Sequence, residues 1–134
     1  MEEAEKCTDE TRKLELLAIA QNCVNVPENG AKTLNEACQA FWFLQLLIQP
    51  ESSGHSISPG RFDQYMYPYY KKDLDNGSLT PEFAQELIDC IWVKLNDLTK
   101  IRDAASAEGF AGYGVFQNLI VGGQSAPGVD ATND

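Results

Sequence analysis

The sequence has few basic residues, a single histidine and no long apolar run. Its 134 residues include 10 Lys and Arg against 20 Asp and Glu, a net charge of −10. The basic residues are scattered, and phosphate binding needs clustered Lys and Arg, so nucleic acid and anionic membranes are not expected partners. No apolar run approaches the roughly 20 residues that span a bilayer. The acidic start, Met-Glu-Glu-Ala-Glu-Lys, is unlike a secretory signal and predicts a cytoplasmic protein.

The sequence also lacks closely paired cysteines. Its four cysteines have no C-x-x-C spacing; they are Cys7, Cys23, Cys38 and Cys90. Without a secretory signal they predict reduced thiols, mostly buried as small apolar side chains, and no metal site. The length allows one domain at most, or part of one.

Hydrophobic periodicity predicts helices over residues 10–24, 33–49 and 81–102, and a strand over residues 115–121. Thr33 and Glu36 predict a capping box, in which the hydroxyl and the carboxylate each accept from an otherwise unpaired backbone N–H. Pro50 is expected to end that helix. The third helix continues weakly to residue 108, where Gly109 is expected to end it. The strand is expected to be buried, because its apolar end runs into Gly-Gly, and the tail after it to be a loop.

The second predicted helix is apolar on every side near its end. From residue 40 to residue 48 its only polar residue is Gln45. A helix that is apolar all round is buried all round, and three or four helices cannot surround it. Each large side chain left in water forfeits roughly 1.5–3 kcal/mol. Because a single strand also needs neighbours, the sequence predicts a larger protein or a partner.

Residues 51–72 show neither a helix period nor a strand period, which predicts an irregular loop or part of a site. His55 and Ser56 lie together in this stretch. Adjacent residues rarely place a hydroxyl on an imidazole, so the pair suits recognition of small polar groups better than nucleophilic catalysis. A purely structural, hydrogen-bonded loop is the alternative. Arg61 and Asp63 are expected to form a charge network that holds the loop, and the four tyrosines to pack around Pro68 rather than line a pocket.

Four runs carry a resemblance to a known family. They are G-H-S-I-S-P-G-R-F-D-Q-Y-M-Y-P-Y-Y-K-K at 54–72, F-W-F-L-Q at 41–45, W-V-K-L-N at 92–96 and F-Q-N-L-I-V-G-G-Q at 116–124. The sequence resembles the glycyl radical enzymes of the pyruvate formate-lyase domain family. Within that family it is most similar to the branch of the B12-independent glycerol and propanediol dehydratases.

The resemblance implies an α/β fold, a ten-stranded barrel of two opposed half-barrels, of which this segment is mostly helical with one or two short strands. It implies a reaction in which a glycyl radical converts a cysteine to a thiyl radical, which takes a hydrogen atom from the substrate. His55 and Ser56 would then bind the hydroxyl groups of a small diol such as glycerol or propane-1,2-diol. The parent enzyme would be a homodimer whose radical is installed by a radical SAM activating enzyme.

The sequence departs from the family where the radical chemistry occurs. The active-site motif G-C-x-E and the radical motif R-V-x-G-Y are both absent, and no Arg precedes Phe110-Ala111-Gly112-Tyr113. Residues 1–134 are therefore expected to be an internal fragment of the barrel domain, with no catalytic residue, no bound cofactor and no activity alone. A pyruvate formate-lyase (formate acetyltransferase), another glycyl radical eliminase, and a small helical non-enzymatic interaction module are the alternatives.

Overall fold

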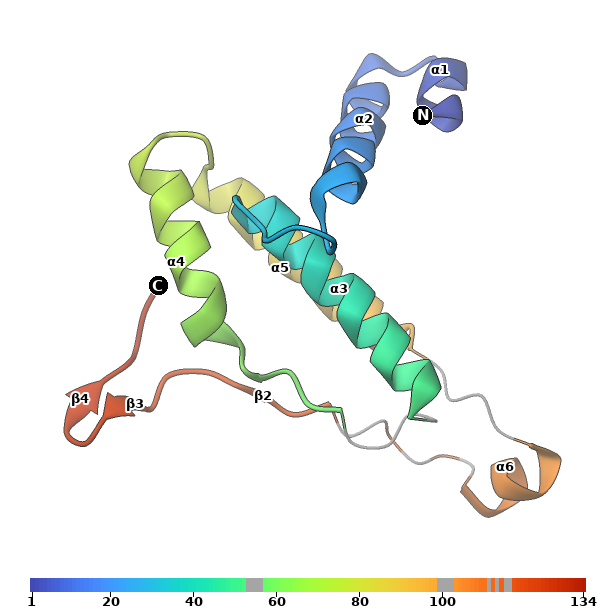
Figure 1. Ribbon diagram of the computed structural model, residues 1–134, viewed down its shortest axis with the longest axis vertical. Helices are drawn as coiled ribbons and strands as arrows, with labels where there is room; N and C mark the ends of the chain where they lie inside the picture. The colour runs from blue at the N-terminus through green and yellow to red at the C-terminus, as the bar shows by residue number, and fades with distance from the viewer. Residues whose placement is uncertain (53–56, 99–102, 111, 113, 115–116) are drawn as a thin grey trace.

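The computed structural model describes residues 1–134 except residues 53–56, 99–102, 111, 113 and 115–116 (Figure 1). The elements of the described chain are α1 (Glu2–Lys6), α2 (Glu10–Asn25), α3 (Leu34–Glu51), β1 (Gly60–Arg61), α4 (Phe62–Asp75), α5 (Pro81–Asn96), α6 (Ala104–Phe110), β2 (Leu119–Ile120), β3 (Gln124–Ala126) and β4 (Val129–Asp130). This segment is therefore mostly helical, as the resemblance implies, but its described residues contain four short strands rather than one or two.

Helices α3 and α5 lie side by side, and α4 packs against α3 (Figure 1). Helices α1 and α2 contact each other and project away from this pair. The hydrophobic core therefore lies between α3, α4 and α5. Its buried members are Leu34, Ala37, Cys38, Phe62, Met66, Leu79, Ala84, Ile91 and Leu95.

The core positions follow the helical period. Leu34, Ala37 and Cys38 are spaced three and four residues apart, which places them on one face of α3. Phe41 continues that face one turn later. Its ring meets the ring of Phe62 from α4 edge-on, with centroids 5.2 Å apart, a favoured aromatic geometry.

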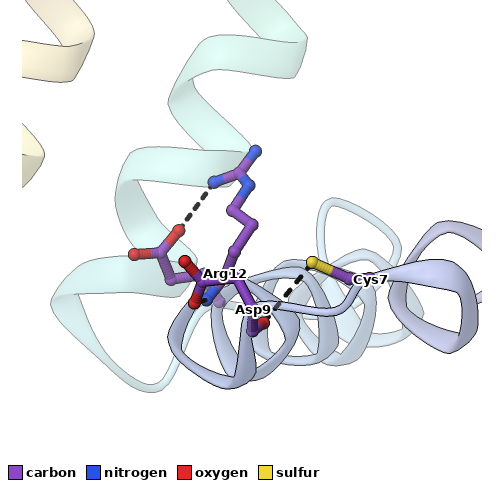
Figure 2. A network of polar contacts seen from close by, with 4 residues as sticks. Cys7, Asp9 and Arg12 are labelled. Atoms are coloured by element: carbon purple, nitrogen blue, oxygen red, sulfur yellow. Dashed lines mark hydrogen bonds and ion pairs between the residues drawn. The ribbon is translucent and has the colours of Figure 1, made fainter.

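The start of α2 is held by a local polar network (Figure 2). The Asp9 side chain accepts a hydrogen bond from the Arg12 backbone N–H at 3.0 Å, which makes Asp9 the N-cap. The Cys7 thiol donates to the Asp9 carbonyl oxygen at 3.4 Å. Arg12 also pairs with Glu15 at 2.7 Å, one turn along the helix. These contacts link α1 to α2 but do not reach the core.

The start of α3 is held from two sides. The Thr33 hydroxyl accepts from the Glu36 N–H at 3.2 Å, as predicted. The Glu36 carboxylate accepts from the Lys32 N–H at 2.6 Å rather than from that of Thr33, so the second half of the predicted capping box is shifted by one residue. The buried carboxylate of Asp73, at the end of α4, accepts from the Leu34 N–H at 2.7 Å. Helix α4 thus satisfies an end group of α3 that its own turn cannot.

Two predicted helix ends are wrong. Pro50 lies inside α3, which ends at Glu51, because in the last turn a proline removes only one backbone donor. The Ser52 N–H still donates to the Ile48 carbonyl at 2.9 Å. Helix α5 ends at Asn96 instead of continuing to residue 102 or 108, and Gly109 lies within the separate helix α6.

The predicted irregular loop is helical from Phe62 onward. Helix α4 contains Pro68 in its interior, although a proline there loses one hydrogen bond. Phe62 and Met66 are buried and four residues apart, so they form an apolar stripe that anchors the helix on the core. Packing of this stripe outweighs the missing hydrogen bond.

The strands are shorter and more exposed than predicted. Of the strand expected over 115–121, only β2 (Leu119–Ile120) is a strand, while Val115 and Phe116 lie outside the described residues. It pairs in parallel with β1, Gly60 opposite Leu119. Ile120 and Val121 are 50% and 70% exposed, which contradicts a buried strand. The tail, predicted as a loop, contains the antiparallel pair β3 and β4.

The cysteines are less buried than predicted. Only Cys38 is buried, whereas Cys7 is half-buried and Cys23 and Cys90 are exposed. Burial raises the pKa of the Cys38 thiol to about 12, so this thiol stays protonated at neutral pH.

The second half of α3 reverses the usual burial pattern. Leu44, Leu47 and Ile48 are 50%, 63% and 41% exposed, while Gln45 and Gln49 are only 5% and 3% exposed. The described chain therefore does not surround this helix, as the sequence predicts for three or four helices. Three large aliphatic side chains face solvent on one helix, and two amides face inward.

Candidate functional site

The predicted substrate-binding residues His55 and Ser56 lie outside the described residues. Both flanks of that segment are described. On one side α3 ends at Glu51 and is capped by Ser52. On the other side the chain continues through residues 57–59 into β1. What the structure shows of the candidate site is therefore the set of contacts made by these two flanks.

Two buried glutamines of α3 hold the chain directly after Ser56. The Gln45 side-chain amide donates to the Ile57 carbonyl oxygen at 2.8 Å, and that of Gln49 donates to the same oxygen at 3.1 Å. Gln45 donates a second bond to Gln117 Oε1 at 3.0 Å. A carbonyl oxygen that accepts two hydrogen bonds is fully paired, which fixes the backbone at Ile57.

A second set of contacts joins residues 57–61 to residues 117–120. The Asn118 N–H donates to the Ser58 hydroxyl at 3.2 Å, and the Gly60 N–H donates to the Asn118 carbonyl at 3.1 Å. Gln117 also donates to the Leu95 carbonyl at the end of α5, at 3.0 Å. Residues 57–60 are thus tied to α3 and, through Gln117 and Asn118, to α5.

Arg61 and Asp63 each hold this region through a backbone group distant in sequence, where the sequence predicted a charge network. Asp63 Oδ2 accepts from the Gly122 N–H at 2.6 Å, and Arg61 donates to the Gln124 carbonyl at 2.9 Å. Gly122 has φ +68°, a conformation that favours glycine, so the Gly-Gly pair shapes this contact. Burial acts to raise the pKa of Asp63, but the hydrogen bonds from Gly122 and Gln64 outweigh it and lower that pKa.

The tyrosines of α4 divide into two roles. The Tyr65 hydroxyl donates to the Pro59 carbonyl at 3.0 Å, and burial raises the pKa of Tyr65 to about 12. Tyr67 and Tyr70 have rings 6.2 Å apart and, together with Asp63, line a mostly apolar pocket of about 270 Å³ between α4 and α5. The prediction that no tyrosine lines a pocket is wrong for these two.

The described residues that flank the candidate site offer mainly hydrogen-bonding groups. The described residues as a whole contain no cluster of three or more His, Cys, Asp or Glu side chains that could hold a metal ion. Within the same residues, no helix has both the length and the apolar character that crossing a membrane requires. Backbone carbonyls and side-chain amides make most of the hydrogen bonds on the flanks of the candidate site. Such hydrogen bonds can hold a backbone segment in a fixed position.

Sequence reasoning missed the positioning role of Gln45, Gln49 and Gln117. One signal was present, because Gln45 interrupts an otherwise apolar run. A lone polar residue in such a run either faces a partner or a polar network inside the fold. Gln49 and Gln117 gave no comparable signal, since each stands beside other polar or turn-forming residues.

Comparisons with known proteins agree over the whole chain. The sequence pattern of the family described as pyruvate formate lyase-like matches residues 1–134. The isethionate sulfite-lyase of Nitratidesulfovibrio vulgaris is 43% identical over 133 residues, covering 98% of this chain and 16% of that protein.

Two solved structures superpose closely. One, from work on 1,2-propanediol dehydration in Roseburia inulinivorans, is 74% identical with a TM-score of 0.91, covering 99% of this chain and 17% of that one. The other is the glycerol-bound form of the B12-independent glycerol dehydratase from Clostridium butyricum, 57% identical with a TM-score of 0.87, covering 98% and 16%. The chain thus spans about one sixth of the length of the relatives it matches.

Proposed function

The chain belongs to the pyruvate formate lyase-like family of glycyl radical enzymes, and on that premise we propose that it is a segment of a diol dehydratase. The longer protein would remove water from propane-1,2-diol or glycerol. The main support for this proposal is the 74% identity, over 99% of the chain, to the structure from work on 1,2-propanediol dehydration. The 43% identity to the isethionate sulfite-lyase makes a sulfonate substrate the weaker candidate.

In this proposal His55 and Ser56 bind the hydroxyl groups of the diol. Both side chains can donate and accept hydrogen bonds, which a vicinal diol requires. The anchored carbonyl of Ile57, directly after them, supports a fixed rather than a freely moving backbone at this point. Neither residue is assigned a covalent step.

The radical chemistry belongs to other parts of the longer protein. A glycyl radical, installed by a radical SAM activating enzyme, would supply the hydrogen-atom abstraction. Neither the G-C-x-E motif nor the R-V-x-G-Y motif occurs in residues 1–134. The segment therefore supplies substrate contacts, and we expect no turnover from the 134-residue chain alone.

What this segment leaves unfinished supports its proposed place in the barrel domain that the family resemblance implies. The parallel pair β1 and β2 has only two residues in each strand, and parallel strands are normally covered on both faces. The exposed aliphatic side chains on the second half of α3 also need a cover. We place both inside the ten-stranded barrel domain of a longer, homodimeric enzyme.

The experiment is an assay of the longer protein, activated without oxygen by its radical SAM enzyme. Formation of propanal from propane-1,2-diol and of 3-hydroxypropanal from glycerol is expected. His55→Ala and Ser56→Ala should each raise KM about tenfold, the cost of one lost hydrogen bond to a polar substrate. Acetyl transfer between pyruvate and coenzyme A, or sulfite release from isethionate, with no diol turnover would overturn the proposal.

A small interaction module with no enzymatic role is tested separately. A 134-residue chain that sediments as a monomer and melts cooperatively would favour such a module. Self-association or a melt without a cooperative transition supports the segment of a longer enzyme, because exposed aliphatic side chains then lack their normal cover.

A further inference from the structure

The pocket between α4 and α5 combines apolar and aromatic walls with an acidic lining. Helices α4 and α5 each pack against α3, and the pocket of about 270 Å³ lies between them. Tyr67 and Tyr70 form part of its wall, with ring centroids 6.2 Å apart. Its charged lining residues are Asp63 and Asp134, and no Lys or Arg of the described chain lines it. The lining is therefore negative and has no cation of its own.

The carboxylate of Asp63 has one oxygen in use and one without a partner. Oδ2 accepts from the Gly122 N–H at 2.6 Å and from the Gln64 side-chain amide at 3.0 Å. Oδ1 is buried and has no hydrogen-bond partner among the described residues. Buried polar atoms are nearly always paired, because an unpaired one costs free energy. Asp63 therefore has pairing capacity that this segment does not use.

The basic side chains nearest to Asp63 in sequence are engaged elsewhere. Arg61 donates to a backbone carbonyl in β3 at 2.9 Å, and Lys71 pairs with Asp75. Neither Asp63 nor Asp134 takes part in an ion pair within the described part of the chain. A cation that pairs with Asp63 would have to come from outside this segment.

The size and lining of the pocket fit one long basic side chain. Pockets for separate small-molecule ligands usually have volumes of about 300–1,000 Å³, so this pocket is small for such a ligand. Lys and Arg have an apolar stem that packs on apolar surface. Their cationic head is attracted both to carboxylates and to the faces of aromatic rings such as those of Tyr67 and Tyr70.

A longer protein has ample chain to supply this side chain, because residues 1–134 span about one sixth of the relatives they match. We propose that the pocket between α4 and α5 binds a Lys or Arg side chain from the part of the longer protein outside residues 1–134. The apolar stem packs against the tyrosine rings, and the cationic head pairs with Asp63. This inference rests on the longer protein of the proposed function, but not on its substrate.

The first test places a photo-crosslinker at the rim of the pocket in the longer protein. Gln85 is exposed and lines the pocket, so Gln85→p-benzoylphenylalanine puts a benzophenone there without altering the core. Glu86→p-benzoylphenylalanine is the matched control, because Glu86 is exposed on the same helix and does not line the pocket. After illumination, mass spectrometry should find position 85, but not position 86, joined to a Lys- or Arg-containing peptide from outside residues 1–134 of the same chain.

The second test asks whether the basic residue found in this way pairs with Asp63. It is replaced by Met, alone and together with Asp63→Asn, which keeps an oxygen for the Gly122 N–H. If the two groups pair, both single variants remove the same interaction, so their effects are not additive. The double variant should then melt at about the same temperature as the less stable single variant.

Four results would overturn the proposal: no crosslink at position 85, equal crosslinks at positions 85 and 86, a crosslinked peptide without Lys or Arg, and additive losses of melting temperature. A crosslink to a second copy, detected by mixing isotopically heavy and light protein, would also overturn it. None of these measurements needs turnover. Absence of diol dehydration would therefore overturn the proposed substrate and leave the result for this pocket intact.

Discussion

The two halves of α3 differ in which side chains they bury. In the first half, residues 34–41, the apolar side chains Leu34, Ala37 and Cys38 face the core, and Thr33 and Asp73 satisfy the helix start. In the second half, residues 44–49, three of the four aliphatic side chains are exposed and the two glutamines are buried. The apolar side chains in the first half of α3 are thus buried within this chain, whereas most of those in the second half are exposed.

The difference shows how a segment of a larger fold can be identified from physical chemistry. An exposed leucine forfeits roughly 1.5–3 kcal/mol relative to a buried one, so three aliphatic side chains on one face are a substantial loss for a chain this size. The first half needs nothing beyond α4 and α5. The second half needs a cover that the described residues do not provide, and we assign that cover to the longer protein.

The largest expected effect comes from Leu47→Glu. In the longer protein an unpaired carboxylate would be buried at this position, at a cost of several kcal/mol, and we expect loss of soluble, folded enzyme. In the 134-residue chain Leu47 is 63% exposed, so the same change should reduce self-association without further unfolding. Solubility and sedimentation of both proteins check this.

Leu47→Ala gives a milder version of the same comparison. It should cost about 2–5 kcal/mol in the longer protein, as buried leucines do, and little in the short chain. Leu34→Ala is the matched control, because Leu34 is 2% exposed within the segment itself and should be costly in both. Equal melting temperatures for Leu47→Ala and wild type in the longer protein would contradict the account.

A smaller effect is expected from Asp73→Ala, which acts on the first half of α3. Asp73 is 3% exposed and accepts the Leu34 N–H, so its loss leaves a buried donor unpaired and should cost about 1–3 kcal/mol. Asp75→Ala, two residues later on the same helix, removes only an exposed ion pair and serves as the control. Thermal melts of the longer protein should show the first change and not the second.

The smallest expected effect is the pH dependence contributed by Asp63. Hydrogen bonds from Gly122 and Gln64 lower its folded-state pKa below the ordinary value of 3.8. Its contribution to stability is therefore present above that ordinary value and is lost as pH falls through the lowered folded-state pKa. Melting temperatures from pH 7 down to about pH 2 should be higher for wild type than for Asp63→Asn at neutral pH, and the difference should shrink as pH falls below 3.8. A constant difference across this range would show that the charge of Asp63 does not contribute.

The sequence predicted the elements with strong local signals and missed those set by tertiary contacts. Helices α2, α3 and α5 begin at or next to the predicted residues 10, 33 and 81, where Asp9, Thr33 and Thr80 cap them, because capping is a local property. Helix α4 was missed because Pro68 and four tyrosines hide an apolar stripe that only packing on the core reveals. The strand at 115–121 was predicted as buried because the pattern shows apolar character and not which neighbours are present.

The candidate site was predictable only in part. The pair His55 and Ser56 stands out in sequence as the only histidine beside a hydroxyl, and its assignment stays a prediction. Gln45 was visible as an exception in an apolar run, but its acceptor, Ile57, lies 12 residues away and follows from the fold. The partners of Asp63 and Arg61 lie about 60 residues away, a distance that local patterns do not bridge.

The most direct test of the missing cover is thiol labelling at position 47. Leu47→Cys would be exposed to a maleimide in the 134-residue chain and in the longer protein under the same native conditions, with labelling followed by peptide mass spectrometry. Buried Cys38 is the internal control for protection in the short chain, and exposed Cys23 is the control for access. The account predicts rapid labelling at position 47 in the short chain and protection in the longer protein. Equally rapid labelling in both would contradict it.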